Sequence, residues 1–583
     1  MSKARIRWIG GPVLKARTEG PFHVHEAIAV GAQRLLGEVI QLDGDLIVAQ
    51  VYEDTTGLKP GDPVEGTGAA LSVSLGPGIL GHIFDGLLRP LGAVTEHWFE
   101  PGLGARRNQE FDFTPCAAAG DSLAPGQPFG EVAGHGPGRL CLVPPDVSGR
   151  IVSIASAGRH AEDEIVLVLE TPAGERKLAM QHDWPVRRPR PVAARLLADA
   201  PMVTGQRILD TLFPVARGGR AALPGGFGTG KTVLQESLAK WCDTDIIVYV
   251  GCGERGNEMA EVLDELPELE DPRTGRPLME RTVIIANTSN MPVAAREASI
   301  YTAITVAEYF RDQGLHVALM ADSTSRWAEA LREVSGRLGE LPGESGYPAY
   351  LASRLADFYE RASRVTPLAG GEGSVTVIGA VSPPAGDFSE PVTSHTKRYV
   401  RSFWGLDRSR AQARFYPAIH PLSSYAEDVD TLARWWQLQG NPDWKSHRRR
   451  LLTLLEQQAR LERMARIVGK DALPAEQQLT LLCADLVNEG FLRQSAFSPA
   501  DRYCSPRRQT AMLKLMMRFM DLAEEAIAQG AAPDDIAAMP VLRSLQRLGE
   551  EYPEDRVDEM TAVAAVVESA FSRLARQETA NAG

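Results

Sequence analysis

The pattern of hydrophobic and polar positions changes along this 583-residue chain. Up to about residue 70, and again from about 113 to 188, short apolar runs are separated by turns rich in Gly and Pro, which is typical of small β-rich modules. Between about 190 and 430, short apolar runs alternate with helical segments, the pattern of a parallel sheet built from βαβ units. After about 430 the pattern is helical. The chain is therefore predicted to be a multidomain α/β protein.

Five apolar runs are predicted to be strands of the parallel sheet. They are Arg220–Leu223, Ile246–Val250, Val283–Ala286, Val317–Ala321 and Val375–Val381. In sheets of this kind, ligands bind outside the carboxyl ends of the strands. We therefore expect the functional residues just after these runs.

Composition and charge narrow the class of protein. The formal net charge of −13 argues against binding duplex nucleic acid, which requires a positive surface. No run approaches the ~20 apolar residues of a membrane helix, and no signal peptide is evident. We expect a cytoplasmic protein that reaches a membrane only through partners. The six cysteines are scattered, which predicts reduced core thiols.

The strongest motif is a glycine-rich loop between a predicted strand and a predicted helix. It matches G-x-x-x-x-G-K-T, in which backbone N–H groups surround phosphates, the lysine contacts the β- and γ-phosphates and the threonine hydroxyl ligates Mg²⁺. A structural turn without nucleotide would need neither Lys231 nor Thr232. The predicted ATP- or ADP-binding residues here are Gly225, Gly226, Phe227, Gly228, Thr229, Gly230, Lys231, Thr232 and Val233.

Asp322 follows the apolar run Val317–Ala321, which resembles a Walker B segment. A carboxylate at the end of such a strand can orient the water shell of Mg²⁺. A strand-terminal aspartate is more often a helix cap. Its place downstream of a phosphate loop favours the magnesium interpretation.

A second glycine pattern follows the run Ile246–Val250. Gly251, Gly253 and Gly256 match G-x-G-x-x-G, so dinucleotide binding is an alternative, although the motif alone is weak. The acidic residues about 20 positions later lie in a turn and not at a strand end. We favour Glu254 as the residue that activates the water attacking the γ-phosphate, with Arg255 stabilising the transferred phosphoryl group.

Taken in order, these motifs resemble the A subunits of V-type and archaeal-type rotary ATPases, in particular those of bacteria. The resemblance covers nearly the whole chain and includes Thr204–Asp210, Gly251–Glu258, Asn287–Glu297 and Gly379–Pro384. It implies an N-terminal β-barrel at 1–70, a bulge insertion at 113–188, a RecA-like nucleotide domain at 71–112 and 189–430, and a C-terminal helical domain at 431–583.

The resemblance also implies site residues and partners. Glu258 joins Glu254, Lys231 and Arg255 in the catalytic site, while Tyr416, Phe491 and Gln494 form the adenine pocket. Where the family usually has Ile-Asn-Trp after Pro-Ala, this chain has Ile419–Leu422, a departure at the pocket rim. B subunits alternate with A subunits in a hexamer and supply an arginine finger. Central and peripheral stalks link this hexamer to a membrane sector that translocates H⁺ or Na⁺.

Two other functions are weighed against this one. The first is a nucleotide-binding subunit without turnover, which the presence of Lys231 together with Glu254 disfavours. The second is a hexameric motor of another kind, such as a secretion ATPase or an RNA translocase. The predicted bulge insertion and the acidic charge disfavour it.

Overall fold

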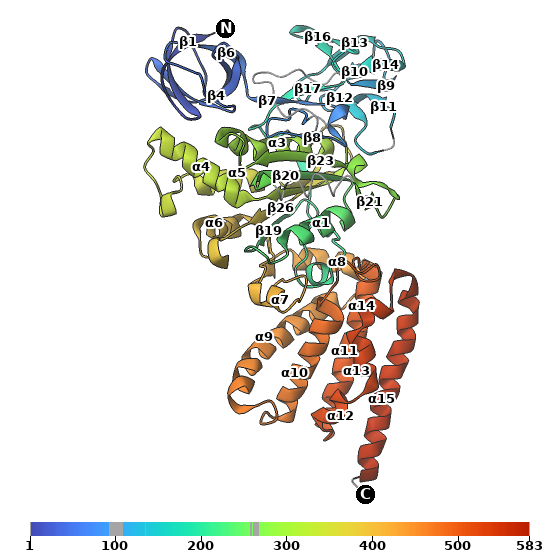
Figure 1. The fold of residues 1–583 in the computed structure, drawn as a ribbon. Helices are drawn as coiled ribbons and strands as arrows, with labels where there is room; N and C mark the ends of the chain where they lie inside the picture. The colour runs from blue at the N-terminus through green and yellow to red at the C-terminus, as the bar shows by residue number, and fades with distance from the viewer. Residues whose placement is uncertain (1, 92–108, 135, 257–258, 260–267, 582–583) are drawn as a thin grey trace. The chain divides into compact units, whose positions relative to one another are not determined.

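A computed structural model describes residues 2–91, 109–134, 136–256, 259 and 268–581 (Figure 1). The chain divides into two compact units. The first comprises Met1–Leu197, Arg217–Arg220 and Thr244–Val400, and the second Ala198–Ala216, Ala221–Asp243 and Arg401–Gly583.

The first unit begins with a closed six-stranded β-barrel. Its strands are β1 (Lys3–Gly10), β2 (Val13–Thr18), β3 (Glu26–Val30), β4 (Leu35–Asp43), β5 (Leu46–Val51) and β6 (Pro63–Ala70), in the order β1-β2-β5-β4-β3-β6. Alternate side chains point inward, so that Ile6, Leu14 and Val39 are buried in one core. The predicted N-terminal barrel is confirmed.

A β-rich module follows the barrel. It contains two four-stranded sheets, in the orders β10-β13-β15-β16 and β12-β11-β9-β14. The strands are β9 (Glu110–Pro115), β10 (Ser122–Leu123), β11 (Pro128–Val132), β12 (Leu140–Leu142), β13 (Gly149–Ile154), β14 (Gly158–Ala161), β15 (Leu167–Thr171) and β16 (Gly174–Leu178). β7 (Ser72–Leu75) pairs with β17 (His182–Pro185), so the chain enters and leaves the module side by side, as an insertion should.

A parallel sheet forms the centre of the first unit, in the order β26-β24-β20-β23-β8. The strands are β8 (Ile83–Phe84), β20 (Ile246–Glu254), β23 (Thr282–Thr288), β24 (His316–Asp322) and β26 (Gly373–Val381). Helix α3 (Val293–Arg311) packs on four of them and is buried along nearly its whole length. Four of the five predicted strands are confirmed here, and the fifth is β19 (Arg220–Pro224).

Shorter elements complete the first unit. They are β18 (Ala194–Arg195), β21 (Glu270–Asp271), β22 (Arg276–Pro277), α4 (Thr324–Leu338), α5 (Leu351–Tyr359), β25 (Ser363–Thr366) and α6 (Pro391–Tyr399). β25 runs antiparallel to β26 and continues the sheet to β18.

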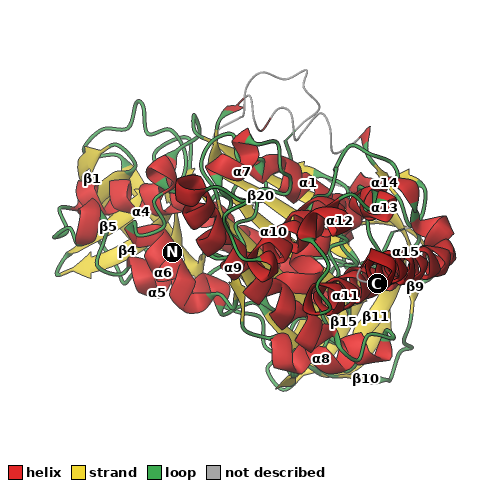
Figure 2. Ribbon diagram, turned by 90° about the horizontal axis from the view of Figure 1, so that it is seen from below, coloured by secondary structure: helices red, strands yellow, loops and turns green. Residues whose placement is uncertain are grey.

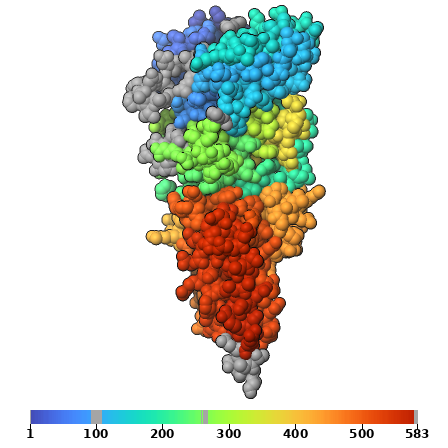
Figure 3. Space-filling model, turned by 90° about the vertical axis from the view of Figure 1, so that its right-hand side faces the viewer, coloured from blue at the N-terminus to red at the C-terminus, as the bar shows by residue number. Residues whose placement is uncertain are grey.

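The second unit joins a small sheet to a set of helices. β19 lies parallel to β27 (Ser402–Phe403), which pairs with β28 (Tyr425–Ala426), and α1 (Lys231–Trp241) follows β19. The remaining helices are α7 (Arg408–Gln412), α8 (Val429–Leu438), α9 (Trp444–Val468), α10 (Ala475–Val487), α11 (Pro506–Ala528), α12 (Pro533–Ala537), α13 (Pro540–Gln546), α14 (Leu548–Glu551) and α15 (Met560–Asn581). Figure 2 draws α9, α10, α11 and α15 as helices, and the stretch of this unit from residue 401 onward is orange to red in Figure 3. The predicted C-terminal helical domain is confirmed.

Two further sequence expectations can be compared with the structure. All six cysteines are free thiols, as expected, but Cys116 is exposed and only the other five lie in the interior. Among the described residues, no helix has the length and apolar character needed to cross a membrane.

A buried ionic cluster fixes the barrel to α3 within the first unit. The Arg187 guanidinium donates to both carboxylate oxygens of Glu38 on β4, at 2.8 Å each, and to both of Glu297 on α3, at 3.0 and 2.8 Å. Glu38 also accepts from the Tyr52 hydroxyl and lies 3.0 Å from His25 Nδ1. Because Glu38 is fully buried, this pairing is needed to keep its charge in the interior.

We expect this cluster to make the first unit sensitive to acid. Burial raises the pKa of Glu38, but the charge of Arg187 and hydrogen bonds from His25, Arg187 and Tyr52 outweigh it and lower the pKa from 4.5 to about 2. Folding therefore favours the carboxylate. Its contribution, about 3 kcal/mol, is present above pH 4.5 and is lost as the pH falls toward 2.

The measurement is thermal unfolding between pH 7 and pH 3 for the wild type and for Glu38→Gln, which has no carboxylate to titrate. The wild type should lose stability more steeply below pH 4.5. Parallel pH dependences in the two proteins would show that Glu38 does not couple protonation to folding.

Candidate functional site

The predicted phosphate loop connects β19 to the first turn of α1 in the second unit. Gly230 has a left-handed backbone, with φ of +81°, and caps the helix that begins at Lys231. The Thr229 hydroxyl donates to the Gly226 carbonyl at 2.8 Å and closes the loop on itself. Lys231 and Thr232 are the first two residues of α1, where the backbone N–H groups of the first turn and the helix dipole favour an anion.

A cavity of about 740 Å³ opens beside this loop, entirely within the second unit. Its volume lies in the range of pockets for small ligands and cofactors. Gly230 and Val233 line it from the loop and α1, and Tyr416 and Pro417 line it from the segment after α7. The Tyr416 ring lies directly against Gly230, since a Cβ placed there would be 3.1 Å from the ring.

The loop after η6 (Asn488–Leu492) supplies another wall of the cavity. Gln494, which is predicted for the adenine pocket, lines it and is 2 % exposed. Phe491 is fully buried and is not among the described residues that line the cavity. Phe497, to which the sequence assigned no role in the site, lines it and is 85 % exposed.

The departure from the family pattern lies elsewhere. His420, Pro421 and Leu422 line a separate cavity with Arg410 and Phe415, and among the described residues none of the three borders the cavity beside the phosphate loop. The unusual sequence after Ala418 therefore lies outside the walls of the larger cavity, and not at its rim as expected.

The other predicted catalytic residues belong to the first unit. Glu254 ends β20 and is 7 % exposed, and Asp322 ends β24 and is 3 % exposed. These neighbouring strands run parallel, with Gly251 opposite Asp322, so both carboxylates lie at the same edge of the sheet. Arg255 directly follows β20 on the surface. Glu258 lies outside the described residues.

Two glycines of the G-x-G-x-x-G motif, Gly251 and Gly253, lie within β20 and allow close packing, whereas Gly256 has open space around it. Gly253 has a φ of +75°, and a Cβ there would lie 2.7 Å from the Arg296 side chain. The acids about 20 positions after the motif are Glu270 and Asp271, which form β21 of a short hairpin and not the turn expected from the sequence. Asp271 is already paired, since it lies 3.0 Å from the Arg281 guanidinium. Both features favour the interpretation that rejects a dinucleotide site.

Comparison with known proteins covers the chain in four consecutive parts. Family models match the ATP synthase alpha/beta family beta-barrel domain at residues 8–68, the alpha/beta subunit barrel-sandwich domain at 104–187, the alpha/beta family nucleotide-binding domain at 205–426, and the C-terminal domain of V and A type ATP synthase at 433–536.

Curated relatives match almost from end to end. The chain is 49% identical to the A subunit of the A-type ATP synthase of Methanopyrus kandleri and 50% identical to an A subunit of the A-type ATP synthase of Methanospirillum hungatei. It is also 49% identical to the V-type ATP synthase alpha chain of Halothermothrix orenii. Each match covers 98% of this chain and 98% of the relative.

The chain belongs to the family of A-type and V-type ATP synthase A subunits. The family resemblance predicted from its motifs is confirmed, and the narrower likeness to bacterial members stays a prediction. A solved structure of the assembled ATPase EscN, from the type III secretion system of enteropathogenic E. coli, matches with a TM-score of 0.63 over 88% of this chain and 99% of that one. At 22% identity this likeness concerns the fold alone, and the secretion-type alternative is not favoured over membership in the A-subunit family.

Proposed function

We propose that this chain is the catalytic A subunit of a rotary ATPase that hydrolyses or makes Mg·ATP and couples the reaction through rotation to the transport of H⁺ or Na⁺. The observation that carries the proposal is a complete phosphate loop that opens α1 beside a cavity of about 740 Å³, in a chain of the A-subunit family.

The phosphate loop supplies the positive groups of the site. Backbone N–H groups of Gly228 to Thr232 surround the phosphate oxygens, and the Lys231 ammonium neutralises charge on the β- and γ-phosphates. The Thr232 hydroxyl and the Asp322 carboxylate are hard oxygen donors of the kind that suits Mg²⁺. When held there by Thr232 and Asp322, Mg²⁺ would neutralise negative charge on the phosphates.

Water activation is assigned to Glu254. Its carboxylate accepts a hydrogen bond from the attacking water, aligns it with the γ-phosphorus and takes up its proton. Arg255 and Glu258, close in sequence, complete the set of residues at the reacting phosphate. The half-exposed Tyr416 ring, beside Gly230, stacks on the adenine, with Gln494 and Phe491 as supporting residues of the base pocket.

The proposed partners follow from the family. B subunits alternate with this chain in a hexamer and contribute an arginine finger, and stalk subunits connect the hexamer to a membrane sector at the cytoplasmic face. The proposed domains are a barrel at 1–70, a bulge at 113–188, a nucleotide domain at 71–112 and 189–430, and a helical domain at 431–583. Motion of the helical domain on nucleotide binding would drive rotation.

Lys231→Ala tests the proposal at the phosphate loop. We expect ATP hydrolysis by the complex assembled with B subunits to fall by about a hundredfold or more, the loss seen when one preorganised group is removed from a site of this kind. Nucleotide binding should weaken as well, because the lysine contacts the phosphates of the ground state. Hydrolysis is measured by phosphate release and binding by equilibrium titration with ATP.

The matched control is Lys240→Ala, which removes a lysine from the last turn of the same helix. It should leave hydrolysis close to the wild-type rate. Equal losses in the two variants would mean that the helix, and not the phosphate-loop lysine, determines activity, and would remove the main support for a catalytic role.

A further inference from the structure

Arg207 is a fully buried arginine in the segment that leads into η2 (Ile208–Leu212) of the second unit. Only 1 % of its side chain is exposed. Burying a guanidinium is costly unless its charge and its N–H groups are all paired. Its partners therefore indicate what it does.

The guanidinium holds three points of a single loop. Nε donates to the Phe491 carbonyl at 2.5 Å, Nη2 donates to the Arg493 carbonyl at 2.6 Å, and the Asp501 carboxylate accepts from Nη1 and Nη2. The backbone N–H of Arg207 adds a further bond, to Gln494 Oε1 at 2.8 Å. One residue thus spans the loop from Phe491 to Asp501.

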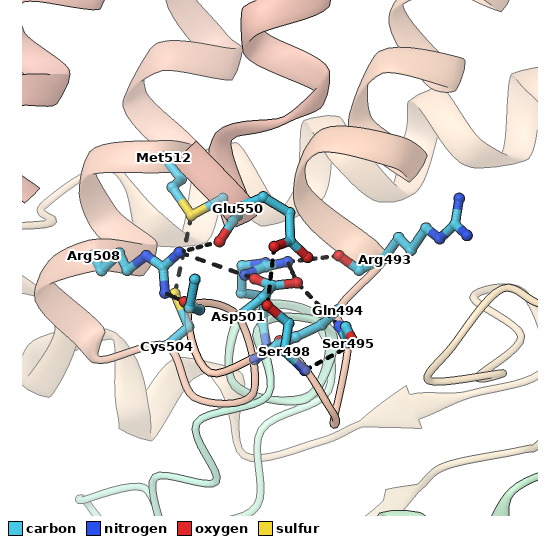
Figure 4. Close-up of polar contacts among 12 residues, drawn as sticks. Arg493, Gln494, Ser495, Ser498, Asp501, Cys504, Arg508, Met512 and Glu550 are labelled. Carbon is cyan, nitrogen blue, oxygen red and sulfur yellow. Dashed lines mark hydrogen bonds and ion pairs between the residues drawn. The ribbon is translucent and has the colours of Figure 1, made fainter. Parts of the chain in front are cut away.

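The loop held in this way lines the cavity beside the phosphate loop. Arg493, Gln494, Ser495, Ala496 and Phe497 all border it. Figure 4 shows Gln494, Ser495 and Asp501 converging on one cluster of polar contacts, in which the Ser495 N–H donates to Asp501 at 3.0 Å. Asp501 therefore ties the guanidinium to the part of the loop that faces the cavity.

The same loop also controls the position of Tyr416. The Gln494 N–H donates to the Tyr416 carbonyl at 2.8 Å, and the Gln494 side-chain amide donates to the Gly205 carbonyl at 2.8 Å. The Gln494 amide is thus occupied by protein backbone on both its oxygen and its nitrogen. Gln494 therefore connects two segments of the cavity wall, and a continuous series of hydrogen bonds runs from Arg207 through Gln494 to the Tyr416 backbone.

The backbone segment that carries Arg207 is itself held in place by Asp210. Asp210 accepts from the Thr204 N–H and hydroxyl and from the Gly205 N–H, at 2.7–2.9 Å, and from Gln509 Nε2 at 2.8 Å. The backbone that carries Arg207 is therefore anchored to itself and to α11. Because its own backbone is anchored, Arg207 can hold the loop from Phe491 to Asp501 in one position.

We propose that Arg207 and Asp501 are positioning residues that determine how tightly the site binds the base of its nucleotide. The inference rests on the proposed ATP-binding function and deepens it. Arg207 holds the loop at Arg493–Phe497, and through Gln494 the Tyr416 backbone, in the geometry that receives a purine. The phosphate loop is closed by its own bond from the Thr229 hydroxyl to the Gly226 carbonyl, so we expect binding of the triphosphate to be independent of Arg207 and Asp501.

The test compares ATP with inorganic tripolyphosphate, which has the same kind of anionic groups but no base. Arg207→Lys keeps the charge but replaces a planar fork by a single nitrogen, which cannot reach both carbonyls and the carboxylate at once. Asp501→Asn keeps the shape of its partner and removes the charge. Both are assayed in the complex assembled with B subunits, as KM and kcat for ATP and as inhibition by tripolyphosphate.

In both variants we expect KM for ATP to rise about tenfold, with kcat and the inhibition constant of tripolyphosphate within about twofold of the wild type. Arg518→Lys, which alters an exposed ion pair between α11 and Glu568, should leave all three unchanged. If the two residues only stabilised the fold, the amount of active complex would fall, but the ratio of KM for ATP to the inhibition constant of tripolyphosphate would stay at the wild-type value.

Equal changes in the constants for ATP and tripolyphosphate would overturn the inference, and so would loss of the folded complex in both variants. Failure of the proposed function looks different. In that case the wild-type complex itself would not hydrolyse ATP, whatever residue stands at position 207.

Discussion

Replacing Glu254 with glutamine is expected to lower ATP turnover by about a thousandfold while leaving Mg·ATP binding nearly unchanged. Glutamine keeps the volume of the side chain at the carboxyl end of β20 but cannot take a proton from water. The Glu254 carbonyl accepts a hydrogen bond from the Ser289 N–H at 2.9 Å, and this contact survives the substitution. The backbone should therefore stay in place.

The comparison requires two measurements on the complex with B subunits, namely steady-state phosphate release and equilibrium binding of Mg·ATP. Glu333→Gln on the exposed side of α4 is the control, because it removes a surface carboxylate from the same unit. If turnover persists in Glu254→Gln, another residue activates the water, and the catalytic role would have to be argued again from Lys231.

Replacing Arg361 with methionine is expected to destabilise the first unit strongly, because Arg361 pairs with the buried Glu308 on α3. Its guanidinium donates to both oxygens of Glu308, at 3.0 and 2.6 Å, and to the Val186 carbonyl at 2.8 Å. Glu308 is 1 % exposed, and although burial raises its pKa, the charges of Arg361 and Arg311 and hydrogen bonds from Arg361 and the Arg190 N–H together outweigh that effect and lower it. Arg361→Met should cost about 3–5 kcal/mol, because it leaves a buried carboxylate short of its partner.

Calorimetry on the whole chain would show this loss as a lower unfolding temperature. The exposed pair of Arg337 and Glu333 offers the contrast, since Arg337→Met should cost no more than about 1 kcal/mol. The double variant Arg361→Met with Glu308→Leu should be less destabilised than the sum of the two single changes. Additive losses would mean that the two side chains do not stabilise each other.

The sheet and the phosphate loop could be predicted because their signals are local. Each predicted strand is an apolar run whose neighbours are turns, and each lies within the observed β19, β20, β23, β24 or β26. The loop at Gly225–Thr232 carries its chemistry in consecutive residues. Periodicity and motif spacing are sufficient for features of this kind.

The wall of the cavity could not be predicted in the same way. Arg207 and Asp501 form their ion pair from distant parts of the chain, and nothing in the sequence around either residue marks the other. Phe491 and Phe497 lie on one short segment, yet only its position in the fold decides which ring is buried and which faces the cavity. Such contacts depend on tertiary packing.

The closed barrel has a consequence for how the chain is made. All six of its strands come from residues 3–70. The barrel can therefore fold, with every strand paired, while the rest of the chain is still being synthesised. The central sheet cannot form so early, because β8 at Ile83–Phe84 must wait for β23 at Thr282–Thr288. A closed barrel has no unpaired strand edge, so the folded N-terminal part of the nascent chain does not offer an edge on which other chains could aggregate.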